Sequence, residues 1–528
     1  MEVLVRLIGA FQLIIAFLHW PYHMYLSYKK THALPPIKSS LLTISAVELA
    51  KKIRRREMKS RTVVEAYIQR IKEVNPALNA VASDRFAEAL ADADKVDQFL
   101  STANMGEEEI EKQTPFLGVP FTVKESIGLK GLSFSVGSLS RKDLKAPDDG
   151  NSVKNLKQAG AIPLCVTTTP EFCTSFETDN IVTGVTRNPY NIYRTCGGSS
   201  GGEGALLGSA ASLIGIGSDI AGSIRIPAMY NGIYGHKPSP GLVSLNGHFP
   251  QSEDKNFSNF LVIGPMARYV DDLKPLLKIM SGEHAAQLRL DEEVDVSKVR
   301  IFYKEDAGFS LVAVPVDREI KCAIREATKF LEQAHSCQVQ EADLKEMEDS
   351  VEIGAAVFLG MEGIPDIRDV PTKKSNEGQN IYLELLKANL GYSEFSITGL
   401  FFSLIVKHNL FIPKEKYGYY CEQNENLRKK INDMLKDNGV FIYPTHPVPA
   451  LHHRESLYRT AGAMYTMIFN TLQLPSTHVP TGLDRNGLPI GFQVVAAEKQ
   501  DRLCFAVAKA LDAKFGGWVP PPSIQTEL

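Results

Sequence analysis

The chain has 528 residues, of which 44% are hydrophobic and 23% are charged, with a formal net charge of -3 at pH 7. These values exclude a disordered chain and a protein that holds nucleic acid through bulk positive charge, and they fit a folded enzyme with a large core. The seven cysteines are scattered and lack C-x-x-C spacing, so we expect free thiols rather than a disulfide framework or a zinc site. The histidines show no metal-ligand spacing, and the pair His452 and His453 is expected on a surface loop.

The N-terminus is more apolar than the rest of the chain. Residues 7–18 are almost entirely apolar, and an aromatic stretch continues to Leu26. A bilayer-spanning helix needs about 20 apolar residues, a length that this segment reaches only with its aromatic end in the interface. Because bulky residues follow Leu18, where a cleavage site would need small ones, we predict an uncleaved anchor, single-pass or interfacial, over residues 1–28, with a linker over 29–40.

Basic residues predict the orientation of this anchor. Lys29 and Lys30 directly follow it, whereas Arg6 on its other side is offset by Glu2. By the positive-inside rule, this distribution favours a catalytic domain in the cytosol. The Asn-Phe-Ser sequon at residues 256–258 is then expected to carry no glycan.

Folded structure is expected to begin with two helices that carry capping boxes. Ser45 and Glu48 form one box, and Thr62 and Glu65 form the other. In the second helix, apolar residues recur at i, i+3 and i+4 spacing, and the Asn-Pro pair at 75–76 is expected to end it.

From about residue 116 onward, short apolar runs alternate with helical patterns. We predict strands at 119–123, 162–166, 299–303 and 440–443, and helices at 152–159 and 318–334. No repeat, low-complexity tract or Gly/Ser linker divides this stretch. The sequence therefore predicts an α/β fold in one catalytic domain over residues 41–520.

A glycine-rich run at residues 197–204 admits several interpretations. A nucleotide-binding loop would end in G-K-[ST], or would show G-x-G-x-x-G followed by an acid, and the run has neither pattern. The pattern G-x-S-x-G fits the nucleophile elbow of an α/β-hydrolase, with His446 or His478 as base, but an elbow must follow a strand and a polar loop with a proline precedes the run. A flexible glycine loop leaves the serines of the run, and the later Ser223, unexplained.

Taken together, the run and its surroundings resemble the amidase signature family. The match is close from Gly197 to Ala228, and it extends to a lysine strand at 116–125 and to three closing motifs: Asn470-x-x-x-Leu474-Pro475, Pro480-x-Gly482 and Gly487-Leu488-Pro489-x-Gly491-x-Gln493. The resemblance covers roughly residues 45–515 and implies a large mixed, twisted β-sheet with helices on both faces. Within the family, the apolar N-terminus, the glycine-rich run and the ending Phe515-Gly516-Gly517-Trp518 are most similar to the fatty-acid amide hydrolases of the second, N-terminally anchored type.

The resemblance implies a Ser-Ser-Lys triad, with Ser223 as nucleophile, Ser199 as proton shuttle and Lys124 as base. A serine hydroxyl must lose its proton as it attacks, and a lysine can accept that proton only while it is neutral. Lowering the pKa of a lysine from about 10.4 to about 7 corresponds to roughly 4 kcal/mol, which burial can supply. Lys124 ends an apolar strand, so its side chain is expected to be buried.

The turn that precedes Ser223 is expected to stabilise the oxyanion. The backbone N–H groups of Ile220, Ala221 and Gly222 can form a nest that faces one point. Ala221 stands where the family most often has glycine, which would make a positive-φ geometry harder to reach while the N–H is retained. We therefore expect alanine to be tolerated at this position.

Three polar residues flank the implied triad. Asp219 and Arg225 lie on either side of the nucleophile, and we expect an ion pair between them that fixes the turn. Ser200 adjoins the shuttle and is expected to orient it. No metal or cofactor is implied, because the triad and the nest supply base, nucleophile and anion stabilisation.

The resemblance implies hydrolysis of fatty-acid amides, such as N-acylethanolamines and primary fatty amides, through an acyl-enzyme on Ser223. The apolar run at 395–412 is either buried core, or part of an acyl-chain channel or a second membrane contact. Alternatives are an amidase or esterase of another small substrate, an amidotransferase subunit, which the apolar N-terminus disfavours, and an inactive membrane-anchored binding protein, which the intact triad disfavours. The expected partners are a lipid amide and the membrane, with no nucleic acid, and the sequence is compatible with a homodimer.

Overall fold

The computed structural model describes residues 3–29, 33–309, 313–368, 380–408 and 412–523. The strands in this part of the chain are β1 (Val81–Asp84), β2 (Pro120–Lys124), β3 (Ile162–Thr167), β4 (Asp179–Asn180), β5 (Gly184–Val185), β6 (Ile214–Asp219), β7 (Tyr234–Lys237), β8 (Val262–Ala267), β9 (Arg300–Tyr303), β10 (Gln338–Glu341), β11 (Gly439–Pro444), β12 (Ser476–Leu483) and β13 (Pro489–Ala496).

The helices are α1 (Val3–Tyr28), α2 (Ala46–Arg54), α3 (Ser60–Leu78), α4 (Phe86–Thr102), α5 (Glu107–Gln113), α6 (Asn151–Gln158), α7 (Gly201–Gly208), α8 (Arg225–Tyr230), α9 (Lys255–Phe260), α10 (Val270–Ser281), α11 (Arg318–His335), α12 (Ser350–Leu359), α13 (Ile381–Asn389), α14 (Ile397–His408), α15 (Tyr417–Leu435), α16 (Met464–Thr471) and α17 (Asp501–Phe515). The predicted strands therefore form β2, β3, β9 and β11, and the two helices predicted after residue 150 form α6 and α11.

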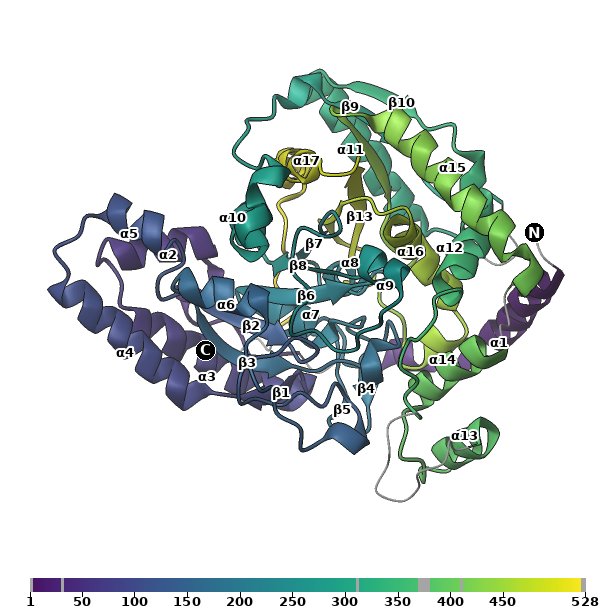
Figure 1. The fold of residues 1–528 in the computed structure, drawn as a ribbon, viewed down its shortest axis with the longest axis horizontal. Helices are drawn as coiled ribbons and strands as arrows, with labels where there is room; N and C mark the ends of the chain where they lie inside the picture. Colours follow the sequence, from purple (N-terminus) through teal and green to yellow (C-terminus); the bar gives the residue numbers. More distant parts are fainter. Residues whose placement is uncertain (1–2, 30–32, 310–312, 369–379, 409–411, 524–528) are drawn as a thin grey trace.

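Within the described residues, one mixed sheet of eleven strands runs through the molecule (Figure 1). Its strand order is β1-β3-β2-β6-β8-β7-β12-β13-β11-β9-β10. The neighbours β3, β2 and β6 are parallel, as are β11, β9 and β10, whereas the strands between β6 and β11 are antiparallel. This arrangement confirms the predicted α/β fold with a large mixed sheet.

Helices cover both faces of this sheet. Successive side chains of a strand point to opposite faces, and in β11 Val440 and Ile442 join a core that contains residues of α10, α11 and α17. Phe441 and Tyr443 join a second core, which contains residues of α12, α15 and α16. The alternation along this single strand therefore separates two helical layers.

The first helices show one confirmed and one incorrect prediction. Ser45 caps α2 as predicted, because its hydroxyl accepts a hydrogen bond from the N–H of Glu48 at 3.3 Å. Helix α3 instead begins at Ser60, ahead of the predicted capping box, where the N–H groups of Ser60 and Arg61 donate to the carboxylate of Asp97. A cap supplied by another helix cannot be read from the local sequence.

The Asn-Pro pair also does not end α3. The helix continues to Leu78 with Pro76 inside its last turn, and Asn79 closes it in the left-handed conformation. The side chain of Asn75 instead accepts hydrogen bonds from the N–H groups of Ala80 and Val81. The predicted stop is therefore three residues too early.

The N-terminal segment forms the long helix α1, which lies on the same side of the molecule as α14 (Figure 1). Gln12 donates a hydrogen bond to Thr460 at 3.1 Å, and His23 lies 3.2 Å from the hydroxyl of Tyr458. No helix in the described ranges has the length and apolar character that crossing a membrane requires. In the predicted linker, Leu34 is buried and its N–H donates to the carbonyl of Pro522, so this residue is part of the folded body.

Candidate active site

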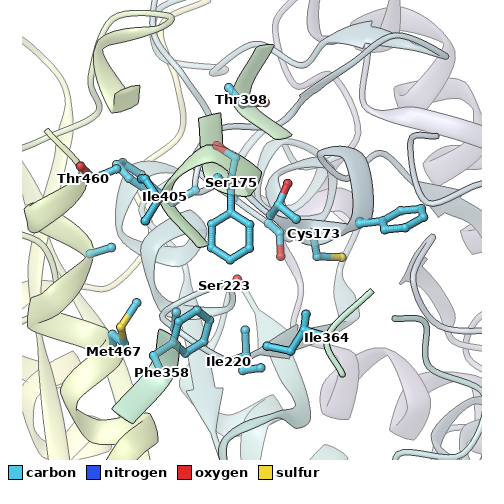
Figure 2. Close-up of a pocket in the computed structure, with 18 of the residues that line it drawn as sticks. Cys173, Ser175, Ile220, Ser223, Phe358, Ile364, Thr398, Ile405, Thr460 and Met467 are labelled. Carbon is cyan, nitrogen blue, oxygen red and sulfur yellow. The ribbon is translucent and has the colours of Figure 1, made fainter. Parts of the chain in front are cut away.

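Two parallel strands bring the implied triad to one edge of the sheet. Because β2 and β6 run parallel as neighbours, their carboxyl ends meet at the same edge. Lys124 is the last residue of β2, Ser223 follows β6 in the turn before α8, and Ser199 lies two residues before α7. Ser199 and Ser223 line one pocket, where the hydroxyl of Ser223 lies near its centre (Figure 2).

Lys124 lies behind the pocket and contacts the glycine-rich run. Its side chain is fully buried, as predicted, and its Nζ lies 2.7 Å from the Oγ of Ser199. Burial lowers the pKa of Lys124 below its usual value of 10.5, against the Cys173 thiol and the Asp219 and Glu203 carboxyls, which raise it. The direction of this shift favours the neutral amine that a general base requires.

Ser218 is a second partner of this lysine that sequence reasoning missed. The Nζ of Lys124 lies 3.0 Å from the Oγ of Ser218 and 3.5 Å from its carbonyl oxygen. Ser218 is the penultimate residue of β6, so the parallel pairing of β2 with β6 places it beside the end of β2. A serine inside a buried strand gives no local signal of this contact.

The glycine-rich run is tied to the nucleophile turn by its backbone. The hydroxyl of Thr169 donates to the carbonyl of Ser199 at 2.8 Å, and the N–H of Ser200 donates to the carbonyl of Ser223 at 3.1 Å. The hydroxyl of Ser200 donates to the carbonyl of Ser218 at 3.3 Å. Ser200 therefore joins the run to both β6 and the turn.

Asp219 and Arg225 form the predicted ion pair, and both side chains are fully buried. The guanidinium of Arg225 donates to both carboxylate oxygens of Asp219 at 3.0 Å each. Arg225 also donates to Asn470 at 2.6 Å and to Gln493 at 2.9 Å, two residues of the closing motifs. The C-terminal motifs therefore help to hold the cation beside the nucleophile.

The carboxylate of Asp219 also organises the turn that leads to Ser223. It accepts hydrogen bonds from the N–H groups of Gly222 at 2.8 Å and Ile224 at 3.1 Å. Burial would raise the pKa of Asp219, but the charge and hydrogen bonds of Arg225 outweigh it and hold this pKa below its usual value. The carboxylate is therefore charged at neutral pH and can keep both donors.

The conformational strain of the turn falls on Gly222 rather than on Ala221. Gly222 has a φ of +119°, and a Cβ at this position would lie 2.1 Å from the Oγ1 of Thr466. Ala221 is not among the residues with positive φ, and its carbonyl accepts a hydrogen bond from Thr466 at 3.0 Å. Alanine thus meets no backbone obstacle at 221, which explains how the chain accommodates it.

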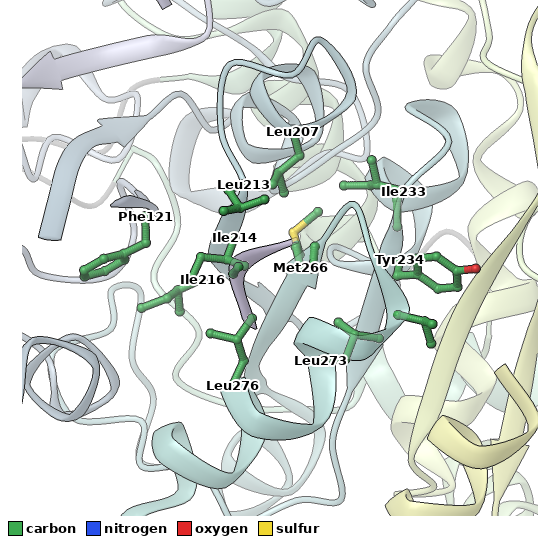
Figure 3. Packing of buried hydrophobic residues seen from close by; sticks show 14 of the residues in the cluster. Phe121, Leu207, Leu213, Ile214, Ile216, Ile233, Tyr234, Met266, Leu273 and Leu276 are labelled. Atoms are coloured by element: carbon green, nitrogen blue, oxygen red, sulfur yellow. The ribbon is translucent and has the colours of Figure 1, made fainter. Parts of the chain in front are cut away.

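The strand that leads to this turn is fixed by packing on both sides. All six residues of β6 are buried, and Ile214 and Ile216 pack in a cluster with Leu207 of α7, Met266 of β8 and Leu273 of α10 (Figure 3). A strand buried on both faces cannot shift its register without exposing apolar area. The position of Ser223 at its end is correspondingly fixed.

The pocket that ends at Ser223 has a mostly apolar wall. Its apolar side chains include Phe172, Phe176, Phe257, Leu261, Phe358, Phe401, Phe402, Ile405, Met464 and Met467. Its polar lining residues include Ser199, Ser218, Ser223 and His248, and also Ser175, Thr398 and Thr460. An apolar cavity with a few convergent polar groups is typical of a ligand site.

The apolar run at 395–412 contributes to both core and pocket. Phe395 and Leu400 are buried in a small cluster with Phe172, whereas Phe402 and Ile405 of the same run line the pocket. Residues 409–411 lie outside the described residues. The core interpretation therefore holds for some side chains of the run, and others line the pocket; an acyl-chain channel or a membrane contact stays a prediction.

The histidines considered from the sequence, His446, His478 and His452, are buried. His446 lies 3.0 Å from the hydroxyl of Tyr230, and Nδ1 of His478 lies 2.7 Å from Thr445, so both candidate bases of the elbow interpretation have core partners. The prediction that His452 lies on the surface is wrong. Its side chain is buried, and the ring of His23 stacks on it at 4.8 Å between centroids. Helix α1 supplies this cover, which the local sequence of the loop does not show.

Comparisons with known proteins place the chain in a family. The family model described as Amidase matches residues 62–505. The chain is 44% identical to fatty-acid amide hydrolase 2-B of Danio rerio over 93% of each chain, and 42% identical to fatty-acid amide hydrolase 2 of Homo sapiens over 92% of each.

Solved structures share the fold. A structure of fatty acid amide hydrolase aligns with a TM-score of 0.72 at 24% identity, covering 92% of this chain and 87% of that one. A structure of 6-aminohexanoate cyclic dimer hydrolase with its substrate aligns with a TM-score of 0.70 at 23% identity, covering 92% of this chain and 99% of that one. The chain therefore belongs to the amidase signature family of amide-hydrolysing enzymes.

Proposed function

We propose that this protein hydrolyses fatty-acid amides, among them N-acylethanolamines and primary fatty amides, to a free fatty acid and an amine. The observation that carries the proposal is an apolar pocket that ends at Ser199 and Ser223, in front of a buried lysine. An apolar wall of this kind suits a long acyl chain, whose burial is favourable by about 0.8 kcal/mol per methylene group. The relatives named fatty-acid amide hydrolase 2 support this substrate class.

In the proposed mechanism, Ser223 is the nucleophile, Ser199 the shuttle and Lys124 the base. The Oγ of Ser223 attacks the amide carbonyl while its proton passes to Ser199, and the proton of Ser199 passes to the neutral amine of Lys124. The 2.7 Å contact between Lys124 and Ser199 supports the second transfer. The lowered pKa of Lys124 supports its role as acceptor.

The tetrahedral intermediate then collapses to an acyl-enzyme. The protonated Lys124 returns its proton through Ser199 to the nitrogen of the leaving group, so that an amine departs and the acyl group stays on Ser223. A water molecule repeats the attack with the same proton path and releases the fatty acid. The base is neutral again at the end of the cycle.

The oxyanion is placed at the N–H groups of the nucleophile turn. Because the N–H of Gly222 already donates to Asp219, we assign the main donors to Ile220 and Ala221, together with the N–H of Ser223. Gly222 contributes through its positive φ, which sets the direction of the neighbouring N–H groups.

We also propose that the enzyme works at a membrane surface, with α1 and α13 lying in the interface. In α1, Phe17 and Leu18 are 76% and 68% exposed; Leu386 of α13 and Leu390, which directly follows this helix, are 58% and 62% exposed. Large exposed apolar patches mark interaction sites, and α14, which follows α13, lines the pocket. A lipid substrate could enter from this side without crossing water.

The catalytic domain is proposed to face the cytosol. Asn256 lies at the start of α9 with an exposed side chain, so a glycosyltransferase could reach it in a luminal protein. Expression in mammalian cells followed by glycosidase treatment should leave the gel mobility unchanged. A glycosidase-sensitive shift that Asn256→Gln abolishes would place the domain in the lumen instead.

The central test is covalent labelling by an alkyl fluorophosphonate, with the adduct located by peptide mass. Labelling is expected on Ser223 in the wild type and is expected to disappear in Ser223→Ala. Ser200→Ala is the matched control, since its hydroxyl bonds to a backbone carbonyl, and it should retain the adduct. Hydrolysis of N-acylethanolamines by the labelled preparation, inhibited in proportion to the label, tests the substrate class separately.

A further inference from the structure

A buried histidine adjoins the catalytic lysine through one serine. His248 lies in the loop between β7 and α9, is 4% exposed and lines the same pocket as Ser199 and Ser223. Its Nε2 lies 3.0 Å from the Oγ of Ser218, and its Nδ1 lies 2.9 Å from the carbonyl oxygen of Pro250. The Oγ of Ser218 in turn contacts the Nζ of Lys124 at 3.0 Å.

The chemistry of these groups fixes the direction of each hydrogen bond. A carbonyl oxygen can only accept, so the Nδ1 of His248 carries the hydrogen that donates to Pro250. A neutral imidazole has one N–H, so its Nε2 is an acceptor, and the hydroxyl of Ser218 must donate to it. A hydroxyl has a single hydrogen, which leaves the Oγ of Ser218 only the role of acceptor toward Lys124.

His248 is neutral under these conditions. Its pKa is lowered to about 3, because burial, together with Lys124 when that amine is charged, outweighs the Pro250 carbonyl, which raises it. The donor and acceptor roles in the hydrogen bonds that link Pro250, His248, Ser218 and Lys124 are therefore the same across the pH range in which an amide hydrolase of this kind would work.

The direction imposed on Ser218 decides where the lone pair of Lys124 points. A neutral amine has two N–H groups and one lone pair, and three oxygens contact this Nζ: the Oγ and carbonyl of Ser218, and the Oγ of Ser199. With both oxygens of Ser218 restricted to accepting, they take the two N–H groups. The lone pair then faces Ser199, while the Cys173 thiol beside the amine is only a weak partner.

We propose that His248 is a positioning residue, which directs the lone pair of Lys124 toward Ser199 by holding the hydroxyl hydrogen of Ser218. Without this acceptor, the hydroxyl of Ser218 can donate to the lone pair and compete with Ser199 for the base. The inference rests on the proposed function, because it assigns a role to His248 only if Lys124 is the base of the Ser199–Ser223 path.

A double-mutant cycle between His248 and Ser218 tests this role. The readout is the second-order rate constant for labelling of Ser223 by an alkyl fluorophosphonate, which needs the same base but no particular amide. His248→Leu is expected to lower this rate constant by about tenfold to a hundredfold. This loss is smaller than the roughly 10²- to 10⁴-fold that a general base contributes in full, because the base itself is still present. His248→Gln, whose amide oxygen can accept from Ser218, is expected to label at least about fivefold faster than His248→Leu.

The decisive comparison is made in the Ser218→Ala background. There His248→Leu is expected to change the rate constant by less than about threefold, because no hydroxyl is left to direct. Equal losses in both backgrounds, or no loss beside an intact Ser218, would overturn the positioning role. Absence of any Ser223 label in the wild type would overturn the proposed function, and the inference with it, so the two failures are distinguishable. Far-UV circular dichroism shows that each variant compared is folded.

Discussion

The catalytic edge of the sheet and the side formed by α1, α13 and α14 are built on opposite physical principles. At the edge, Lys124, Asp219 and Arg225 are fully buried, and each of these side chains has hydrogen-bond partners. On the other side, large apolar side chains such as Phe17 and Leu390 are exposed. In the proposed function, this contrast separates two tasks: the buried polar site activates the nucleophile, and the exposed apolar surface receives the lipid amide.

The largest effect is expected from removing the base at the polar edge. Lys124→Met should lower the rates of Ser223 labelling and of fatty-amide hydrolysis by about 10²- to 10⁴-fold, because the proton of the nucleophile loses its acceptor. Lys130→Met, at a lysine that is 67% exposed, serves as the matched control and should leave both rates within about twofold. Similar losses in the two variants would remove Lys124 from its role.

The pH dependence of the wild type sharpens the same point. Burial lowers the pKa of Lys124 from its usual 10.5. The neutral amine therefore becomes the main form at a lower pH than it does for an exposed lysine. The rate of hydrolysis should therefore rise with pH as Lys124 loses its proton and fall toward acid as it is protonated. A stopped-flow or discontinuous assay across pH would contradict this if the rate were highest at the acid end.

The second-largest effect is expected in stability. Arg225→Met leaves the charge of Asp219 buried without its cation, which should lower the free energy of unfolding by about 3 to 5 kcal/mol. The double variant Asp219→Asn with Arg225→Met removes the stranded charge and should be more stable than Arg225→Met alone. Thermal or denaturant unfolding measures both, and a double variant that is less stable would show that the ion pair does not dominate.

The nucleophile turn allows a matched pair of single-atom changes. Gly222→Ala places a Cβ against Thr466 at a positive φ and should lower turnover at least about tenfold, since strain of about 1 to 3 kcal/mol must be relieved by moving the turn. Ala221→Gly, one residue earlier, should change turnover by less than about threefold. An increase of tenfold or more in Ala221→Gly would show instead that alanine strains the oxyanion site.

The smallest effect is expected on the apolar side, where many side chains share the contact. Leu386→Glu combined with Leu390→Glu should weaken binding of the full chain to phosphatidylcholine vesicles by about tenfold, because each leucine contributes only part of the about 1.5 to 3 kcal/mol that full burial would give. Val47→Glu, on α2 at the other end of the molecule (Figure 1), is the control. Unchanged flotation of the double variant would remove α13 from the proposed membrane contact.

Local patterns predicted the regular elements well where the local sequence also supplies the ends. The strands β2 and β11 and the helix α11 follow directly from apolar runs and periodicity. The start of α3 could not be predicted, because Asp97 of another helix caps it. The burial of His452 was likewise hidden, since its cover comes from His23, more than four hundred residues earlier in the chain.

Some residues of the candidate site could be predicted from sequence motifs, and others are known only from their tertiary contacts. The glycine-rich run, the stretch around Ser223 and the lysine strand name the implied triad from sequence, and the charges of Asp219 and Arg225 predict their pairing. Ser218 lies within the matched stretch but has no role assigned by it, and His248 lies outside the motifs; a serine in a buried strand and a histidine in a loop are common in any fold. Only their distances to Lys124 and to each other give them a role.

By itself, the sequence determined the chemistry: an α/β fold, an amidase signature and the residues implied for nucleophile, shuttle and base. These depend on residue types at short spacing, which a linear pattern preserves. Tertiary structure alone decided the environment of that chemistry, namely the burial of Lys124, the direction of the hydrogen bonds that reach it through Ser218, and the apolar pocket in front of Ser223. Burial and hydrogen-bond direction depend on groups that are distant in the chain, and they exist only once the strands have paired and the helices have packed.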